Sequence, residues 1–256
     1  MKKPSDQQIL SRRNLLQLGV GLIGTGSLTA WFGKDALAQG IEPQTSRLKL
    51  DQLVVADSGS PHAPSKLTPD EALAQLMEGN QRFVDKKRLN PHQNIARVTE
   101  VATGQAPFAA ILSCADSRVV PEIAFDQGIG DLFVVRVAGN IAVTGDTASE
   151  EYAVGMLGTP LLMVLGHERC GAVAAALEGG KFPGAIESLV LAIQPAIKAS
   201  EGEPGDRLTN AVKANVRLQV QRLQVSSVVA SAVQAGKLKV VGAFYDLDTG
   251  AISLVS

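Results

Sequence analysis

The sequence predicts an α/β protein, a single domain with a mostly parallel central β-sheet flanked by helices. Short β-like segments alternate with helical patterns along the chain, and this alternation is typical of βαβ units. The first three β-like segments are almost continuously apolar, as in strands that are covered on both faces. The expected strands are FAAILS (108–113), DLFVVRV (131–137), PLLMVLG (160–166) and KLKVVGAFYDL (237–247).

The predicted domain covers residues 67–256 and begins with a helix. Thr68 can accept a hydrogen bond as the N-cap, Pro69 suits the first helical position, and Glu71 completes a capping box. Apolar side chains then recur at helical spacing as far as Val84. Further helices are expected at about 147–158, 170–178, 185–199 and 206–235.

Two segments precede this domain. Residues 1–38 resemble a twin-arginine export signal, because Arg12-Arg13 precedes a weakly apolar stretch and Ala36-x-Ala38 offers a cleavage site. Such a signal predicts export to a periplasm or a thylakoid lumen. Alternatively, an uncleaved signal would anchor the chain and keep it near a membrane. Residues 39–66 are rich in Pro, Ser, Gly and Gln, and we interpret them as a linker or N-terminal arm.

Composition argues against nucleic acid as a partner. The 256 residues carry a net charge of −1, so no basic surface is expected to attract phosphates. Aromatic residues make up only 4% of the chain, which leaves few side chains on which bases could stack.

Two cysteines and a histidine follow the ends of two predicted strands. Cys114 comes directly after the first strand, and His167-x-x-Cys170 follows the third. In open α/β sheets, ligands gather at the carboxyl ends of strands, so these side chains are expected to meet. Two thiolates and an imidazole form a set that suits zinc, and three protein ligands leave one position for water, as in catalytic zinc sites.

A disulfide is the simplest alternative for two cysteines in an exported protein. A disulfide, however, has no need of a histidine, an acid and an arginine beside it. The twin-arginine route also exports chains that have folded in the reducing cytoplasm, where thiols stay free. The two other histidines, His62 and His92, lie in polar segments with prolines and are expected to be solvated loop residues.

Asp116 and Arg118 follow Cys114 at alternate positions. In an extended backbone they would share one side of the strand with the cysteine. An arginine at this distance can hold a carboxylate in a bidentate pair and keep it ionised. The pair is either a plain ion pair that fixes the loop or a device that orients a water or hydroxide at the metal.

The motifs CADSR (114–118) and HERCG (167–171) together resemble the signature of the β-class carbonic anhydrases. The resemblance implies one zinc ion per subunit, held by Cys114, His167 and Cys170, with Asp116 and Arg118 as the orienting dyad. It also implies an obligate homodimer or a higher even oligomer. Further segments similar to the family, in family order, are GNQRF (79–83), GQAPF (104–108), LFVVRVAGN (132–140), EEYAV (150–154) and YDLDTG (245–250).

The same resemblance implies a substrate pocket. Gln105, Phe133 and Tyr152 match pocket positions, and we add Gly171, which follows the ligand Cys170. Because the family builds its site across a dimer interface, some of these residues are expected to face the neighbouring subunit's zinc. A glutamine at position 105 resembles the plant-type subgroup, in which the aspartate does not bind the metal. Ala138 departs from that subgroup, which has a larger valine.

The hypothesis is therefore zinc-dependent, reversible hydration of CO2 to bicarbonate and a proton, by attack of zinc-bound hydroxide on CO2. Two alternatives remain open from sequence. An enzyme on the same scaffold could hydrolyse CS2 or COS, because the same hydroxide would attack them. A protein that binds zinc or bicarbonate without catalysis is the other.

Overall fold

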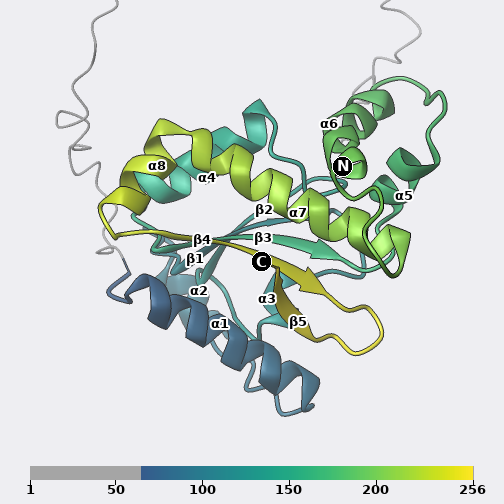
Figure 1. Cartoon of the computed structure of the whole chain (residues 1–256). Helices are drawn as coiled ribbons and strands as arrows, with labels where there is room; N and C mark the ends of the chain where they lie inside the picture. Colours follow the sequence, from purple (N-terminus) through teal and green to yellow (C-terminus); the bar gives the residue numbers. More distant parts are fainter. Residues whose placement is uncertain (1–64, 256) are drawn as a thin grey trace, which may run out of the picture. The chain divides into compact units, whose positions relative to one another are not determined.

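The computed structural model describes residues 65–255 (Figure 1). The expected signal (1–38), most of the linker (39–66) and His62 therefore lie outside the described residues. Among the described residues, no helix combines the length and the apolar character that crossing a membrane requires.

The centre of the fold is a five-stranded sheet in the order β2-β1-β3-β4-β5. The first four strands are parallel, and β5 pairs antiparallel with β4. This arrangement confirms the predicted α/β class and all four predicted strands. The strands are β1 (Ala109–Ser113), β2 (Leu132–Arg136), β3 (Leu161–His167), β4 (Lys239–Tyr245) and β5 (Ile252–Val255).

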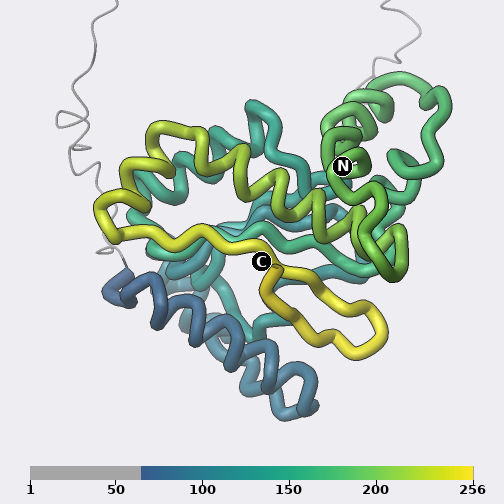
Figure 2. The backbone as a smooth tube through the Cα atoms, in the orientation of Figure 1, coloured from purple at the N-terminus to yellow at the C-terminus, as the bar shows by residue number. Residues whose placement is uncertain are grey.

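Helices cover both faces of the sheet. On one face lie α4, α7 and α8, on the other lies α1, and α5 and α6 pack beside α7 (Figures 1 and 2). Each face has its own apolar cluster, and a third cluster lies where α5, α6 and α7 meet. The helices are α1 (Pro69–Val84), α2 (Ile95–Glu100), α3 (Pro121–Ala124), α4 (Thr144–Gly155), α5 (Gly171–Glu178), α6 (Ile186–Ala199), α7 (Arg207–Val225) and α8 (Ser227–Gln234).

The first helix begins as predicted. The Thr68 side chain accepts a hydrogen bond from the Glu71 backbone N–H, and the Glu71 carboxylate accepts one from the Thr68 N–H, so the capping box is complete. Further along α1, the buried Asn80 bonds the carbonyls of Ala124 and Gly250. This side chain ties α1 to the end of α3 and to the turn before β5.

Three details of the fold differ from the sequence prediction. The expected helix at 206–235 is two helices, because Ser226 ends α7 and its hydroxyl caps α8 at Val229. The helices α2 and α3 were not predicted, since six and four residues are too few to show a periodic pattern. The strand β2 is only half-buried, because it forms an edge of the sheet and lacks a neighbour on one side.

Candidate metal centre and active site

The sheet brings the predicted metal ligands together. Cys114 directly follows β1, His167 ends the adjacent strand β3, and Cys170 is the N-cap of α5. All three are buried, and their ligand atoms lie within 4.8 Å of one another. The site lies at the carboxyl ends of β1 and β3, where the strand order reverses, as expected for ligand sites in open α/β sheets.

The histidine is oriented for a metal. The His167 side chain is fully buried, and its Nδ1 lies 2.9 Å from the backbone carbonyl oxygen of Glu168. This contact assigns the proton to Nδ1, because a carbonyl can only accept. The Nε2 atom then carries the lone pair, and it is buried without a hydrogen-bond partner among the described residues. An orphaned lone pair beside two sulfurs fits a metal ion of the zinc type.

The two sulfurs also fit a cation. No disulfide joins Cys114 and Cys170. A hydrogen bond from Cys170 lowers the pKa of the Cys114 thiol, although burial opposes this. The hydrogen bond to Cys114, together with burial, raises the pKa of the Cys170 thiol. Cysteine binds a metal as its thiolate, so a cation bound between these two sulfurs would displace the thiol protons.

Asp116 and Arg118 form the expected pair, but for a different reason. The strand β1 ends at Ser113, and the following residues make a turn in which the Arg118 N–H donates to Asp116 Oδ1. The extended backbone assumed from sequence is therefore wrong. The guanidinium is nonetheless bidentate, with Nε 2.9 Å from Oδ1 and Nη2 2.7 Å from Oδ2. The hydrogen bond from Arg118 holds the pKa of the Asp116 carboxyl well below its usual range.

Asp116 also faces the candidate metal position. Its Oδ2 lies 3.8 Å from Nε2 of His167, the atom that points at the cluster. An ionised carboxylate held in this place can accept a hydrogen bond from an O–H group at the metal. The dyad is thus adjacent to the cluster, rather than a remote surface ion pair.

Two residues that sequence reasoning did not select support the cysteine loop. Arg136 ends β2 and donates to the carbonyls of Cys114 (3.1 Å) and Asp116 (2.7 Å). The backbone N–H of Gly139 donates to the sulfur of Cys114 (3.3 Å). The predicted parallel pairing of β1 and β2 could have pointed to Arg136, because Ser113, which precedes Cys114, and Arg136 are register partners.

The expected pocket residues fall into two groups. Gly171 begins α5 beside Cys170, and a Cβ added at this position would meet no atom within 4 Å apart from its chain neighbours. Gln105 precedes β1 and so lies at the opposite end of that strand from Cys114. Phe133, whose register partner is Ala110, contacts Tyr152 with ring centroids 6.2 Å apart. Within one chain, therefore, the structure does not bring Gln105 to the three metal ligands. Phe133 and Tyr152 contact each other, but they too lie away from the carboxyl end of β1, where the ligands are.

His92 is an exposed residue of a loop, as expected from the sequence, and it also has a polar partner. Its Nδ1 lies 2.8 Å from a carboxylate oxygen of the buried Asp131. His92 therefore has a structural partner, and the structure does not group it with the metal ligands.

A parallel sheet that gathers two thiols, an imidazole and an Asp–Arg pair at its switch point is typical of an α/β metalloenzyme. The family model for carbonic anhydrase matches residues 109–252. Carbonic anhydrase 2 of Mycobacterium tuberculosis is 40% identical over 187 residues, which cover 71% of this chain and 90% of the relative. The carbonic anhydrase of Mycolicibacterium smegmatis is 39% identical, over 73% of this chain and 94% of the relative. The chain belongs to the β-class carbonic anhydrases, and it is an enzyme of that kind.

Solved structures agree with this assignment. A Coccomyxa β-carbonic anhydrase in complex with acetazolamide has a TM-score of 0.59 and 28% identity, over 72% of this chain and 86% of that one. One of two tetrameric β-carbonic anhydrases from Sordaria macrospora has a TM-score of 0.58 and 27% identity, over 72% and 96%. The noncatalytic alternative is therefore set aside.

Proposed function

We propose that the protein catalyses the reversible hydration of CO2 with one zinc ion per chain, held by Cys114, His167 and Cys170. The observation that carries this proposal is the buried, unpartnered Nε2 of His167, which lies beside two sulfurs and 3.8 Å from the carboxylate of Asp116. A site with three protein ligands and an adjacent acceptor is suited to catalysis more than to structure.

Zinc bound there supplies a Lewis acid that lowers the pKa of water and makes a nucleophile available near neutral pH. Asp116 accepts the hydrogen bond of the attacking O–H group, and this directs an oxygen lone pair at the carbon of CO2. Arg118 keeps Asp116 ionised, so the carboxylate can only accept. Arg136 holds the backbone that leads into this turn, through the carbonyls of Cys114 and Asp116.

The rest of the pocket is proposed to come from a second copy of the chain. Gln105, Phe133 and Tyr152 lie away from their own chain's cluster, yet Tyr152 is 46% exposed and available to a partner. In a dimer, the Gln105 amide would hydrogen-bond an oxygen of the developing bicarbonate, and the two rings would line an apolar space for CO2. Gly171, beside Cys170, leaves room for substrate. Gln105 supports the plant-type form, with Asp116 off the metal, and Ala138 enlarges the pocket relative to valine.

Stopped-flow CO2 hydration on zinc-loaded protein tests the assignment, with COS and CS2 as alternative substrates. Cys170→Ala is expected to lose both zinc and activity. Asp116→Asn is nearly isosteric and is expected to keep one zinc per chain while losing roughly 100-fold in kcat, within the range for positioned acid–base and hydrogen-bonding groups. Full activity in zinc-free protein would refute the metal assignment, and loss of zinc in Asp116→Asn would make Asp116 a ligand.

A further inference from the structure

The loop at Gly139 and Asn140, which contacts the ligand Cys114, has a backbone conformation that is intrinsically unfavourable for most residues. Gly139 has φ +76° and Asn140 has φ +42°, both in the left-handed region that most residues avoid. The loop nevertheless has to be held closely, because the Gly139 N–H donates to the sulfur of Cys114 at 3.3 Å. A hydrogen bond to a thiolate stabilises the charged form and sets the orientation of the sulfur.

A buried asparagine holds the other side of the same glycine. Asn215 on α7 is fully buried, and its Nδ2 donates to the Gly139 carbonyl at 2.8 Å. Both backbone polar groups of Gly139 are therefore used, the N–H by the ligand Cys114 and the carbonyl by Asn215. Without Asn215 this carbonyl would lose its buried partner, and the glycine could rotate its N–H away from the sulfur.

A second buried amide fixes which way Asn215 points. Gln219 lies one helical turn further along α7, and its Nε2 donates to Asn215 Oδ1 at 2.8 Å. Its own Oε1 accepts from the Ala142 N–H (2.9 Å) and from Nη1 of Arg222 (3.2 Å). Two donors thus occupy the Gln219 oxygen, so its nitrogen has to face Asn215, and the nitrogen of Asn215 has to face Gly139.

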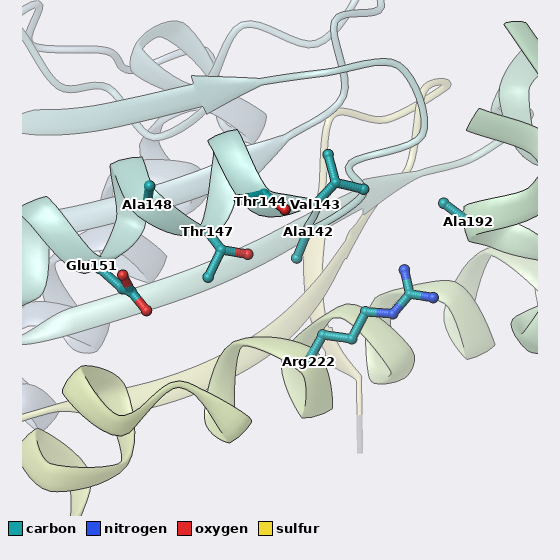
Figure 3. Close-up of a pocket in the computed structure, with 8 residues that line it drawn as sticks. All are labelled: Ala142, Val143, Thr144, Thr147, Ala148, Glu151, Ala192 and Arg222. Atoms are coloured by element: carbon teal, nitrogen blue, oxygen red, sulfur yellow. The ribbon is translucent and has the colours of Figure 1, made fainter. Parts of the chain in front are cut away.

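The outer end of this chain of hydrogen bonds reaches the surface. Arg222 extends from α7 and lines a pocket of about 570 Å³ that Ala142, Thr144, Glu151 and Ala192 also border (Figure 3). The inner members, Asn215 and Gln219, are both fully buried. The relay therefore runs without interruption from a solvent-reached arginine to a candidate metal ligand.

We propose that Asn215 and Gln219 are positioning residues for the metal centre, which together fix the Gly139 N–H on the sulfur of Cys114. The proposal rests on the function proposed above, because it treats Cys114 as a metal ligand. The two amides act through Gly139, because their described hydrogen bonds do not include one to the three ligands. A purely structural pair of buried amides would affect only the stability of the fold.

The test uses protein loaded with an NMR-active cadmium isotope in place of zinc. A hydrogen bond from the Gly139 amide to a cadmium-bound sulfur transmits a scalar coupling between the metal and the amide proton. We expect this coupling in the unmodified protein and its loss in Asn215→Leu, with zinc affinity reduced about 10–100-fold in competition with a chelator. The matched control is Asn210→Leu, because Asn210 lies on the same helix but its side chain donates to the carbonyls of Glu203 and Pro204 instead.

A second variant separates positioning from folding. Gln219→Glu keeps the volume, and its carboxylate, ionised beside Arg222, still accepts from Ala142 and Arg222 but cannot donate to Asn215. We expect it to lose the coupling and weaken zinc binding in protein that still unfolds cooperatively, with both readouts taken well below its melting temperature. An absent coupling in the unmodified protein, or unchanged coupling and affinity in Gln219→Glu, would overturn the proposal. These readouts do not depend on catalysis, so absence of CO2 hydration would instead count against the proposed function.

Discussion

Gly139 occupies a position that a side chain cannot enter. Its φ is +76°, and a Cβ there would lie 2.8 Å from Cδ1 of Ile193 and 3.2 Å from Cβ of Ala172. Gly139→Ala is therefore expected to lower the free energy of unfolding by about 1–3 kcal/mol and to weaken metal binding, because the strained loop also carries the N–H on Cys114. Urea unfolding and zinc titration measure the two effects.

Gly145 provides the control for this substitution. It lies in the first turn of α4, its φ is not positive, and an added Cβ would meet nothing within 4 Å. Gly145→Ala is expected to be neutral or to stabilise the protein by up to about 1 kcal/mol, since alanine favours helix. Equal destabilisation by both substitutions would show that the close approach at Gly139 is unimportant.

At the scale of an element, α4 carries an unusual acid. Glu150 is fully buried, and neither carboxylate oxygen has a hydrogen-bond partner among the described residues. Burial, reinforced by the nearby Asp146, raises the pKa of Glu150 to about 8, from 4.5. The folded protein therefore keeps a proton on Glu150 that the unfolded chain releases, so the contribution of Glu150 to stability is greatest below pH 4.5 and falls as pH rises toward 8.

Glu150→Gln removes the charge and preserves the volume. The fall in stability between about pH 4.5 and 8 is expected to flatten, and at pH 9 the variant should be more stable by a few kcal/mol, because one pKa unit corresponds to about 1.4 kcal/mol. Urea unfolding across pH measures this change, with Glu178→Gln, at an exposed position of α5, as control. An unchanged pH profile would mean that Glu150 has an ionised partner.

The elements also show how far the sequence could be interpreted. Strand positions were predictable, because β1 and β3 are buried on both faces and are therefore apolar throughout. The Asp116–Arg118 pair was predictable, but its turn was not, because alternate spacing fits both an extended strand and a turn whose side chain accepts from the backbone. The sequence could have indicated that Asn215 and Gln219 are buried polar residues, because they stand at i and i+4 among the apolar positions of α7. Their link to Gly139 could not be predicted, because Gly139 is remote in sequence.

For the whole molecule, we propose that residues 1–38 direct an already folded enzyme out of the cytoplasm. Folding first would bury Cys114 and Cys170 and load the metal before the chain meets an oxidising compartment. Replacing Arg12 and Arg13 with lysine is expected to leave the precursor in the cytoplasm, whereas the parent should yield an exported chain that begins at Gln39. Cell fractionation and the mass of the product test this. A full-length product in the membrane fraction would support the anchored alternative.

The surface formed by α4 and the edge strand β2 bears on how the protein assembles. Tyr152 on α4 and Met156, the C-cap of α4, are one turn apart and 46% and 45% exposed, and Tyr152 contacts Phe133 of β2. An apolar helix face beside an unpaired strand edge is a surface that proteins usually cover. We propose that a second copy covers it and that the protein is a dimer or a higher even oligomer, with Gln105, Phe133 and Tyr152 completing the partner's site.

Met156→Arg tests this assembly, because it places a charge in the proposed interface without touching the cluster. It is expected to shift the protein toward monomers and to lower kcat about 10-fold or more while zinc content stays at one per chain, since burying an unpaired charge costs several kcal/mol. Light scattering after size exclusion, at several concentrations, measures the mass. Val225→Arg is the control, because Val225 ends α7 and is 84% exposed. A fully active monomer of the parent chain would contradict the shared site, because one chain alone leaves Gln105 at the far end of β1 from Cys114.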